Sequence, residues 1–145
     1  MKTEKLKEKY IKYELTKDDV FKHQGGHYII ITRSGIEKIQ AIENIRIFYD
    51  VIKCEPNFAG VKARAIKDEL SIETFGSALK GETYKDGNTN TWYCLEMAEK
   101  RAMSRAVLKL TGFYELGVFG EDEAEDFKKK INLNINKNGN NGQTN

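Results

Sequence analysis

The residues best suited to chemistry in this chain are four cations in one segment, "MAEKRAMSRAVLKLTG", at positions 97–112. Lys100, Arg101, Arg105 and Lys109 stand there among small and apolar residues. At about 100° per residue, Arg101, Arg105 and Lys109 form a stripe along one flank of a helix, and Lys100 lies on the opposite flank. Such a stripe is tolerated where it faces water and is useful where it faces phosphates. The segment therefore indicates either a solvated basic surface or a groove for a polyanion.

The element that positions these cations is a long helix, predicted from about Trp92 to Leu110 and ended by Gly112 at a C-cap position. Its expected core face spans an arc of about 120°. Arg105 has no acid four residues away, because Arg101 and Lys109 occupy both positions. The predicted core-face residues are Leu95, Ala102, Met103, Ala106, Val107 and Leu110.

A second cationic segment is the predicted strand "VKARAIKDE", residues 61–69. Strand alternation places Val61, Ala63 and Ala65 on one face and the cations Lys62 and Arg64 on the other. A cationic strand face beside a cationic helix flank could form a groove for a nucleic-acid backbone. Aromatic side chains could stack on bases there, although such residues more often belong to a core; the candidates are Tyr28, Phe48, Tyr49, Tyr84, Trp92 and Tyr93.

The remaining elements follow from hydrophobic periodicity and turn residues. The expected segments are a helix over 2–12, a strand over 28–32, a helix over 35–45 capped by Ser34, a strand over 45–55 stopped by Pro56, a turn over 57–60, a strand over 69–79 and a polar loop over 80–91. This order predicts an α+β fold: an antiparallel β-sheet with a β-hairpin, packed against a long C-terminal helix and a shorter helix.

Charge and composition are segregated along the chain. The formal net charge is only +2, yet residues 115–126 hold six acids and no base, so the rest of the chain is basic. Residues 121–126 are interpreted either as a solvated helix start or as a cap on the basic groove of the same or a neighbouring subunit, displaced by DNA. Residues 1–127 are predicted to form one domain, and 128–145 a disordered tail rich in Asn, Gly and Lys.

Other chemistry finds little support in the sequence. Cys54 and Cys94 have no metal-site spacing and are expected to be reduced thiols of a cytoplasmic protein. His23 and His27 flank two glycines and are expected to be loop residues rather than metal ligands. The chain has no phosphate-binding GK[ST] loop and no apolar run of membrane-spanning length. We therefore expect no enzymatic activity, no metal, no cofactor and no membrane partner.

Two stretches carry a resemblance to a known family. "HYIIITRSGIEKIQAI" and "LEMAEKRAMSRAVLKLTGF", in the same order and within residues 10–115, resemble the single-strand annealing proteins of phage recombination, the Erf and Sak types. These are similar in plan to the eukaryotic Rad annealing protein numbered fifty-two. The family has a β-hairpin leading into a helix, then a three-stranded antiparallel sheet and a long basic helix.

The resemblance implies single-stranded DNA binding and ATP-independent annealing by a ring or helical homo-oligomer in a bacterial cytoplasm. By position, Arg33 matches the basic residue at the strand-to-helix junction, and Arg105 and Lys109 match cations on the long helix. The alternative is a non-catalytic assembly or regulatory module whose basic helix flank binds an acidic protein partner. The candidate DNA-binding residues are Arg33, Lys62, Arg64, Lys100, Arg101, Arg105 and Lys109.

Overall fold

The computed structural model describes residues 2–23, 28–81, 87 and 93–123. The expected polar loop lies largely outside these residues, and the expected tail lies wholly outside them. In chain order the elements are α1 (Lys2–Lys12), β1 (Val20–Lys22), β2 (Ile29–Ile31), α2 (Arg33–Ile42), β3 (Arg46–Glu55), β4 (Phe58–Lys67), β5 (Leu70–Leu79), α3 (Cys94–Leu110), the 3-10 helix η1 (Tyr114–Leu116) and β6 (Val118–Gly120). The predicted α+β class is confirmed, although the long helix α3 is followed by η1 and β6 and is not the last element.

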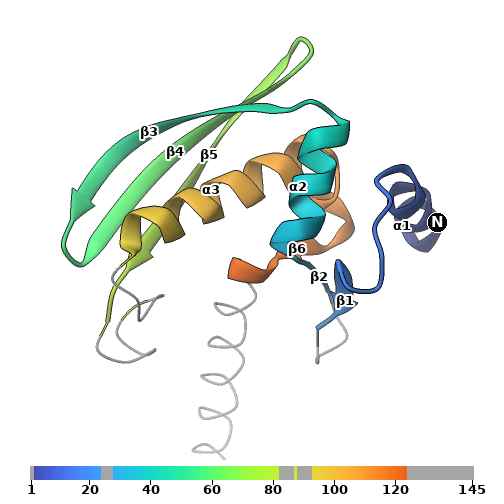
Figure 1. Ribbon diagram of the computed structural model, residues 1–145, viewed down its shortest axis with the longest axis horizontal. Coiled ribbons are helices and arrows are strands. Elements are labelled where there is room, and N and C mark those ends of the chain that lie inside the picture. The colour runs from blue at the N-terminus through green and yellow to red at the C-terminus, as the bar shows by residue number, and fades with distance from the viewer. Residues whose placement is uncertain (1, 24–27, 82–86, 88–92, 124–145) are drawn as a thin grey trace, which may run out of the picture.

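The larger sheet is an antiparallel meander in the order β3-β4-β5, and it arches over α3 (Figure 1). Glu55 pairs with Phe58, which leaves Pro56 and Asn57 as a two-residue turn. The expected turn over 57–60 is therefore wrong in its extent. Pro56 ends β3, but strand pairing resumes at Phe58, the first residue of β4. The second turn is equally short, and Asp68 within it has a positive φ of 52°.

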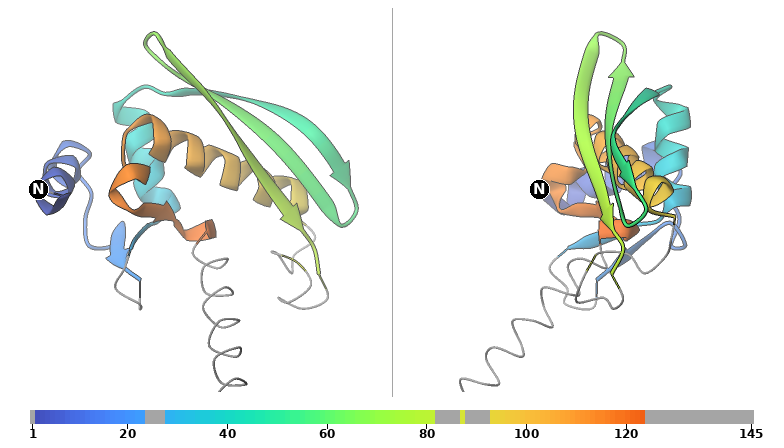
Figure 2. Two further views of the ribbon diagram at one scale, coloured as in Figure 1. Left: turned by 180° about the vertical axis from the view of Figure 1, so that it is seen from behind. Right: turned by 90° about the vertical axis from the view of Figure 1, so that its left-hand side faces the viewer.

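Alternation along the strands divides the sheet into two faces. In β4, Val61, Ala63 and Ala65 are buried and lie on the face that α3 covers. Lys62 and Arg64 alternate with them and lie on the opposite face, as predicted. The side view in Figure 2 shows the sheet and α3 as two layers. We call the face away from α3 the outer face.

The contact between α3 and the sheet is unusually close at Gly76 of β5. A Cβ at this position would overlap the carbonyl oxygen of Ala98 and would lie 2.5 Å from the amide nitrogen of Ala102. Ala98, Ala102 and Ala106 are fully buried along this side of the helix. The hydroxyl of Thr74 donates a 2.6 Å hydrogen bond to the carbonyl oxygen of Ala102. Helix and sheet backbones therefore pack against each other with almost no side chain between them.

The buried surface of α3 differs from the predicted arc. Ala102, Met103, Ala106 and Val107 are buried as expected, but Leu95 and Leu110 at the ends are only partly buried. Elements pack on more than one side of the helix, because α2 and β6 also contact it. Additional buried residues are Cys94, Ala98, Arg101, Ser104 and Leu108. Gly112 follows the helix with φ of 80°, consistent with its predicted role at the end of the helix.

A second, smaller sheet has the order β1-β2-β6, with β1 antiparallel and β6 parallel to β2. α2 starts directly after β2, and its N-cap is Thr32, whose side chain accepts a hydrogen bond from the backbone N–H of Gly35. The prediction of Ser34 as the cap is wrong by two residues. Both residues are types that commonly cap helices. In the first turn, Gly35 packs closely against the side chain of Ile31, because a Cβ on Gly35 would lie 2.7 Å from Cγ1 of Ile31.

Glu43, just after α2, joins three parts of the fold. Its carboxylate accepts a 2.6 Å hydrogen bond from the Tyr13 hydroxyl and forms ion pairs of 2.9 Å with both Lys12 and Lys67. Tyr13 itself is buried and packs against Phe113, with ring centroids 5.7 Å apart. The Tyr13 hydrogen bond, followed by the lysine contacts, lowers the pKa of Glu43 to about 2.

The close contact at Gly76 predicts a large effect of adding one methyl group. Gly76→Ala should lower the free energy of unfolding by about 2–4 kcal/mol, because the obstructing atoms are helix backbone and cannot move aside. Gly60→Ala on the neighbouring strand is the control, since its Cβ would meet only Phe58 ring atoms at 3.8 Å or beyond. Urea unfolding measures both; equal stability of the two variants would contradict the close packing.

The Glu43 cluster predicts a dependence of stability on pH. A carboxyl whose pKa is depressed on folding stabilises the fold above its unfolded pKa of 4.5, and this contribution is lost as pH falls from 4.5 towards 2. Glu43→Gln should remove about 3 kcal/mol at neutral pH and flatten that part of the stability profile. Thermal melts across this pH range measure it. Glu8→Gln, an exposed residue of α1, should leave the profile unchanged.

Candidate nucleic-acid interface

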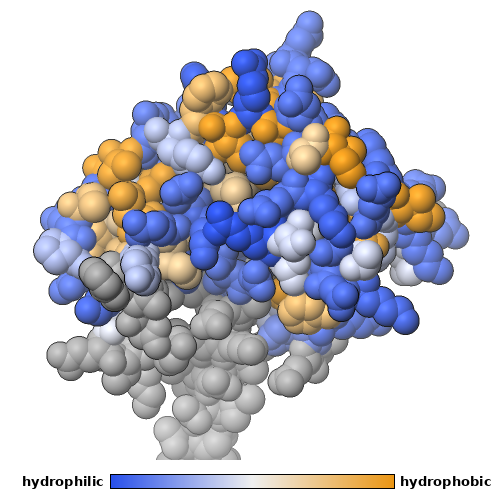
Figure 3. All heavy atoms as spheres, viewed as in Figure 1, coloured by the Kyte–Doolittle hydropathy of each residue, from blue (hydrophilic) through white to orange (hydrophobic). Residues whose placement is uncertain are grey.

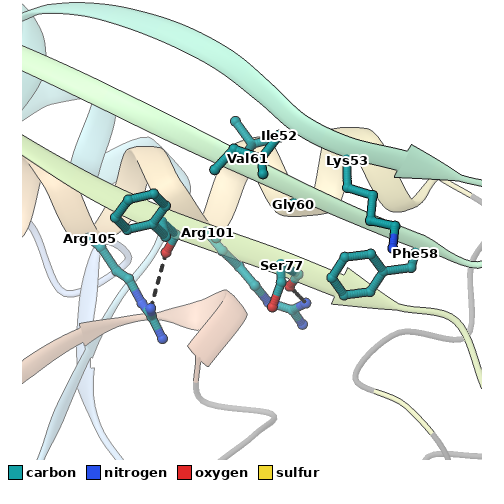
Figure 4. A pocket seen from close by; sticks show the side chains of 10 residues that line it. Ile52, Lys53, Phe58, Gly60, Val61, Ser77, Arg101 and Arg105 are labelled. Atoms are coloured by element: carbon teal, nitrogen blue, oxygen red, sulfur yellow. Dashed lines mark hydrogen bonds between the residues drawn. The ribbon is translucent and has the colours of Figure 1, made fainter.

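Two of the predicted cations bind the backbone of the β5 edge. Nη1 of Arg101 donates to the carbonyl oxygen of Ser77 at 2.9 Å, and Nη1 of Arg105 donates to that of Phe75 at 3.1 Å. Figure 4 shows both side chains coming from α3 and passing the edge of β5. Alternate carbonyls of an edge strand point away from the sheet and need a partner. The two arginines meet this need, so two of the three residues of the predicted stripe have a structural role.

Arg105 also has an acidic partner far along the chain. Its Nε lies 2.7 Å from Oε1 of Glu123, whose other oxygen accepts a 3.4 Å hydrogen bond from the Tyr114 hydroxyl. Residues 121–123 begin a helix as expected, with Glu121 exposed, but Glu123 is buried and is not solvated. The neighbouring Asp122 is half-buried, and burial raises its pKa although Lys100 and Arg101 act in the opposite direction. The acidic segment thus contacts the basic helix within the same chain.

On the outer face, beside these arginines, the sheet contains a hollow of about 300 Å³. Gly60 leaves space at its floor, because a Cβ there would meet no atom closer than 3.8 Å. The rings of Phe58 and Phe75 line the hollow, and Phe75 is 54% exposed. Figure 4 shows the residues around it, which include Lys53, Phe58, Gly60, Ser77, Arg101 and Arg105. The site therefore combines aromatic surface with three cationic side chains.

Lys62 and Arg64 share the outer face but are engaged in their own contacts. Lys62 pairs in register with Phe75 and lies 3.6 Å from Asp50 and 3.8 Å from Glu73. The guanidinium of Arg64 lies 5.5 Å from the ring centroid of Phe48. Because this face points away from α3, the predicted groove between the strand cations and the helix flank does not form. Of the α3 cations, Arg101 and Arg105 pass the β5 edge and reach the outer face.

The other predicted site residues lie apart from the hollow. Lys109 is exposed near the end of α3, with its amino group 5.3 Å from the ring centroid of Tyr114. Lys100 is half-buried. Arg33 lies at the strand-to-helix junction as predicted, where it pairs with Glu37 at 3.1 Å, and its backbone N–H donates to the Glu121 carboxylate. The structure thus separates the seven candidates into an edge pair, an outer-face pair and three cations that lie apart from both pairs.

The aromatic candidates are also dispersed. Phe48 lies on the outer face, Tyr49 on the opposite face of β3, and Tyr28 stacks on His23 with centroids 4.4 Å apart. Tyr93 is exposed before α3, and Tyr84, Trp92 and His27 lie outside the described residues. The sequence analysis missed Phe58, Phe75, Gly60 and Lys53. The alternation of faces along β4 places Phe58 and Gly60 on the same face as Lys62, and this signal could have identified both. Their grouping with Phe75 and Lys53 depends on strand register.

No group of three or more His, Cys, Asp and Glu side chains among the described residues is placed to hold a metal ion. No described helix has the length and apolar character needed to cross a bilayer. Cys54 and Cys94 are free thiols, the first exposed and the second buried.

Comparison with known proteins adds no relative. No protein-family model, no curated protein sequence and no solved structure matches this chain. The resemblance to the phage annealing proteins therefore remains a prediction from the sequence.

Arg101 and Lys109 of α3 differ in burial, so removing their side chains should change the free energy of unfolding by different amounts. Arg101→Ala should lower the free energy of unfolding by about 2–4 kcal/mol, because it empties buried space and deprives the Ser77 carbonyl of a donor. Lys109→Ala, on the same helix but exposed, should change it by less than about 0.5 kcal/mol. Chemical denaturation measures both. A neutral Arg101→Ala would refute its role at the β5 edge.

Proposed function

We propose that this protein binds single-stranded DNA at the hollow on the outer face of the long sheet and promotes strand annealing without ATP. The observation that supports this most is the combination in one hollow of two phenylalanine rings with the guanidinium groups of Arg101 and Arg105. Unpaired bases stack on aromatic rings irrespective of their sequence, and cations contact the backbone between them. A volume of about 300 Å³ is at the lower end for small-ligand sites and fits about one nucleotide.

The phenylalanine rings of the hollow favour the binding of single-stranded DNA over duplex DNA. Phe75 is half-exposed at the border of the hollow, so a base could cover its ring without any rearrangement of the core. Bases in a duplex are already stacked on their neighbours and present only edges and phosphates. Stacking on Phe58 or Phe75 is therefore available to an unpaired strand alone.

The cations at the hollow contribute less to DNA affinity than their number suggests. Lys53 lies 3.4 Å from Glu55, and Arg105 is paired with Glu123, so two of the three cations at the hollow already have an acidic neighbour. Phosphate must compete with these carboxylates. We therefore expect modest affinity per protomer and a fall in affinity with salt that reflects few phosphate contacts.

Annealing requires more bases than one hollow holds, so we propose that the protein acts as a homo-oligomer; the resemblance implies a ring or helical filament. We also propose that it acts in a bacterial cytoplasm, where two free thiols remain reduced. The competing idea, an acidic protein bound to the flank of α3, has less support. It gives no role to the exposed Phe75 ring that lines the hollow beside the two arginines.

The proposal predicts preferential binding of single strands that depends on Phe75. Fluorescence anisotropy at about physiological salt should show tighter binding of a labelled single-stranded oligonucleotide than of its duplex. Phe75→Ala should weaken single-strand binding roughly 5- to 100-fold, which is the value of one base–aromatic stack. Duplex binding should change little.

Leu70→Ala is the matched control for this experiment. Leu70 lies on the same strand and is as exposed as Phe75, but it does not line the hollow. Its removal should leave the affinity unchanged. Equal affinity for single and double strands, or equal effects of the two substitutions, would exclude the hollow as the DNA site.

A further inference from the structure

The two edges of the long sheet are treated differently by the rest of the fold. At β5, the guanidinium groups of Arg101 and Arg105 bind the carbonyls of Ser77 and Phe75, which blocks the approach of another strand. At the opposite edge, β3 pairs only with β4 among the described residues. Proteins normally protect a long edge strand from pairing with other chains. Here one edge is protected and the other is open.

The open edge is long and carries apolar side chains. Nine of the ten residues of β3 are exposed. Phe48, Tyr49, Val51 and Ile52 lie at its centre on either side of Asp50, and all four are large exposed hydrophobic residues. Figure 3 shows hydrophobic surface over this part of the sheet. Apolar residues gathered at an unpaired edge are typical of an interaction surface.

The charges of β3 indicate which strand would fit. The strand begins with Arg46, ends with Glu55 and carries Asp50 and Lys53 near its centre. An antiparallel copy of the same strand would bring Arg46 of each chain to the Glu55 end of the other. A parallel copy would instead place like charges together, which is unfavourable. The two ends of β3 are therefore complementary in the antiparallel direction, while Asp50 of each copy would lie near the two-fold axis beside Asp50 of the other copy, which is unfavourable.

We propose that β3 pairs with β3 of a second copy of this chain, which makes a two-fold symmetric dimer with a continuous six-stranded sheet. Tyr49 and Val51 lie on the same face of β3, so the copies would form aromatic and β-branched cross-strand contacts there. A two-fold axis perpendicular to the sheet keeps both outer faces on one side, so both hollows would face the same way. Each copy contributes the same strand to this contact, so the assembly is complete with two copies. A ring would instead need two different contact surfaces on each copy.

The test is sedimentation equilibrium of the full chain without DNA, from micromolar to submillimolar concentration. We expect a reversible monomer–dimer equilibrium, because one strand pair is at the small end of stable interfaces. Arg46→Glu and Glu55→Arg should each raise the dimer dissociation constant roughly 10-fold. The double variant Arg46→Glu/Glu55→Arg restores opposite charges at both ends and should recover the original constant.

A second pair of variants separates the open edge from the blocked one. Val51→Lys should abolish the dimer, whereas Leu70→Lys on β5, a residue of similar exposure, should retain it, with the fold of both checked by circular dichroism. A monomer at every concentration, a particle larger than a dimer, or failure of the double variant to recover would each overturn the proposal. Because no DNA is present, the outcome is independent of whether the hollow binds DNA.

Discussion

The backbone of α3 lies directly on the backbone of β5 at Gly76, and much of the remaining structure depends on this contact. It is possible because residues without bulky side chains meet on both layers: Ala98 and Ala102 on the helix, and Gly76 on the strand. At this separation the long side chains of Arg101 and Arg105 have no room between the layers. They pass the border of β5 instead and bind its carbonyls on the way. Helix packing thus determines where two of the basic groups reach the surface.

This arrangement gives the two faces of the sheet different properties. The inner face is covered by α3, and its small residues allow the close approach. The outer face has no helix over it among the described residues, and it combines Phe58 and Phe75 with a glycine floor. Apolar side chains left at a surface without a covering layer favour an external partner, and a stacked base meets that requirement.

Acidic neighbours offset several of the cations on and beside the outer face of the sheet. Lys62 lies near Asp50 and Glu73, Lys53 near Glu55, and Arg105 against Glu123. Most of these acids lie on neighbouring strands or much later in the chain. A charge pattern read along one helix is therefore a poor guide to the potential at its surface.

The sequence by itself determined the class of the fold, most of the helices and strands, and the alternation that separates Val61 and Ala63 from Lys62 and Arg64. These features follow from local periodicity, which short-range sterics and burial impose on each element separately. Tertiary structure alone decided that Glu123 binds Arg105, that Arg101 is buried, and that Phe58 and Phe75 border one hollow. Those outcomes depend on strand register and on the distance between layers, which bring together residues 17 or more positions apart in the chain. No periodicity within a single segment encodes such a distance, because it is fixed by the packing of Gly76 against α3.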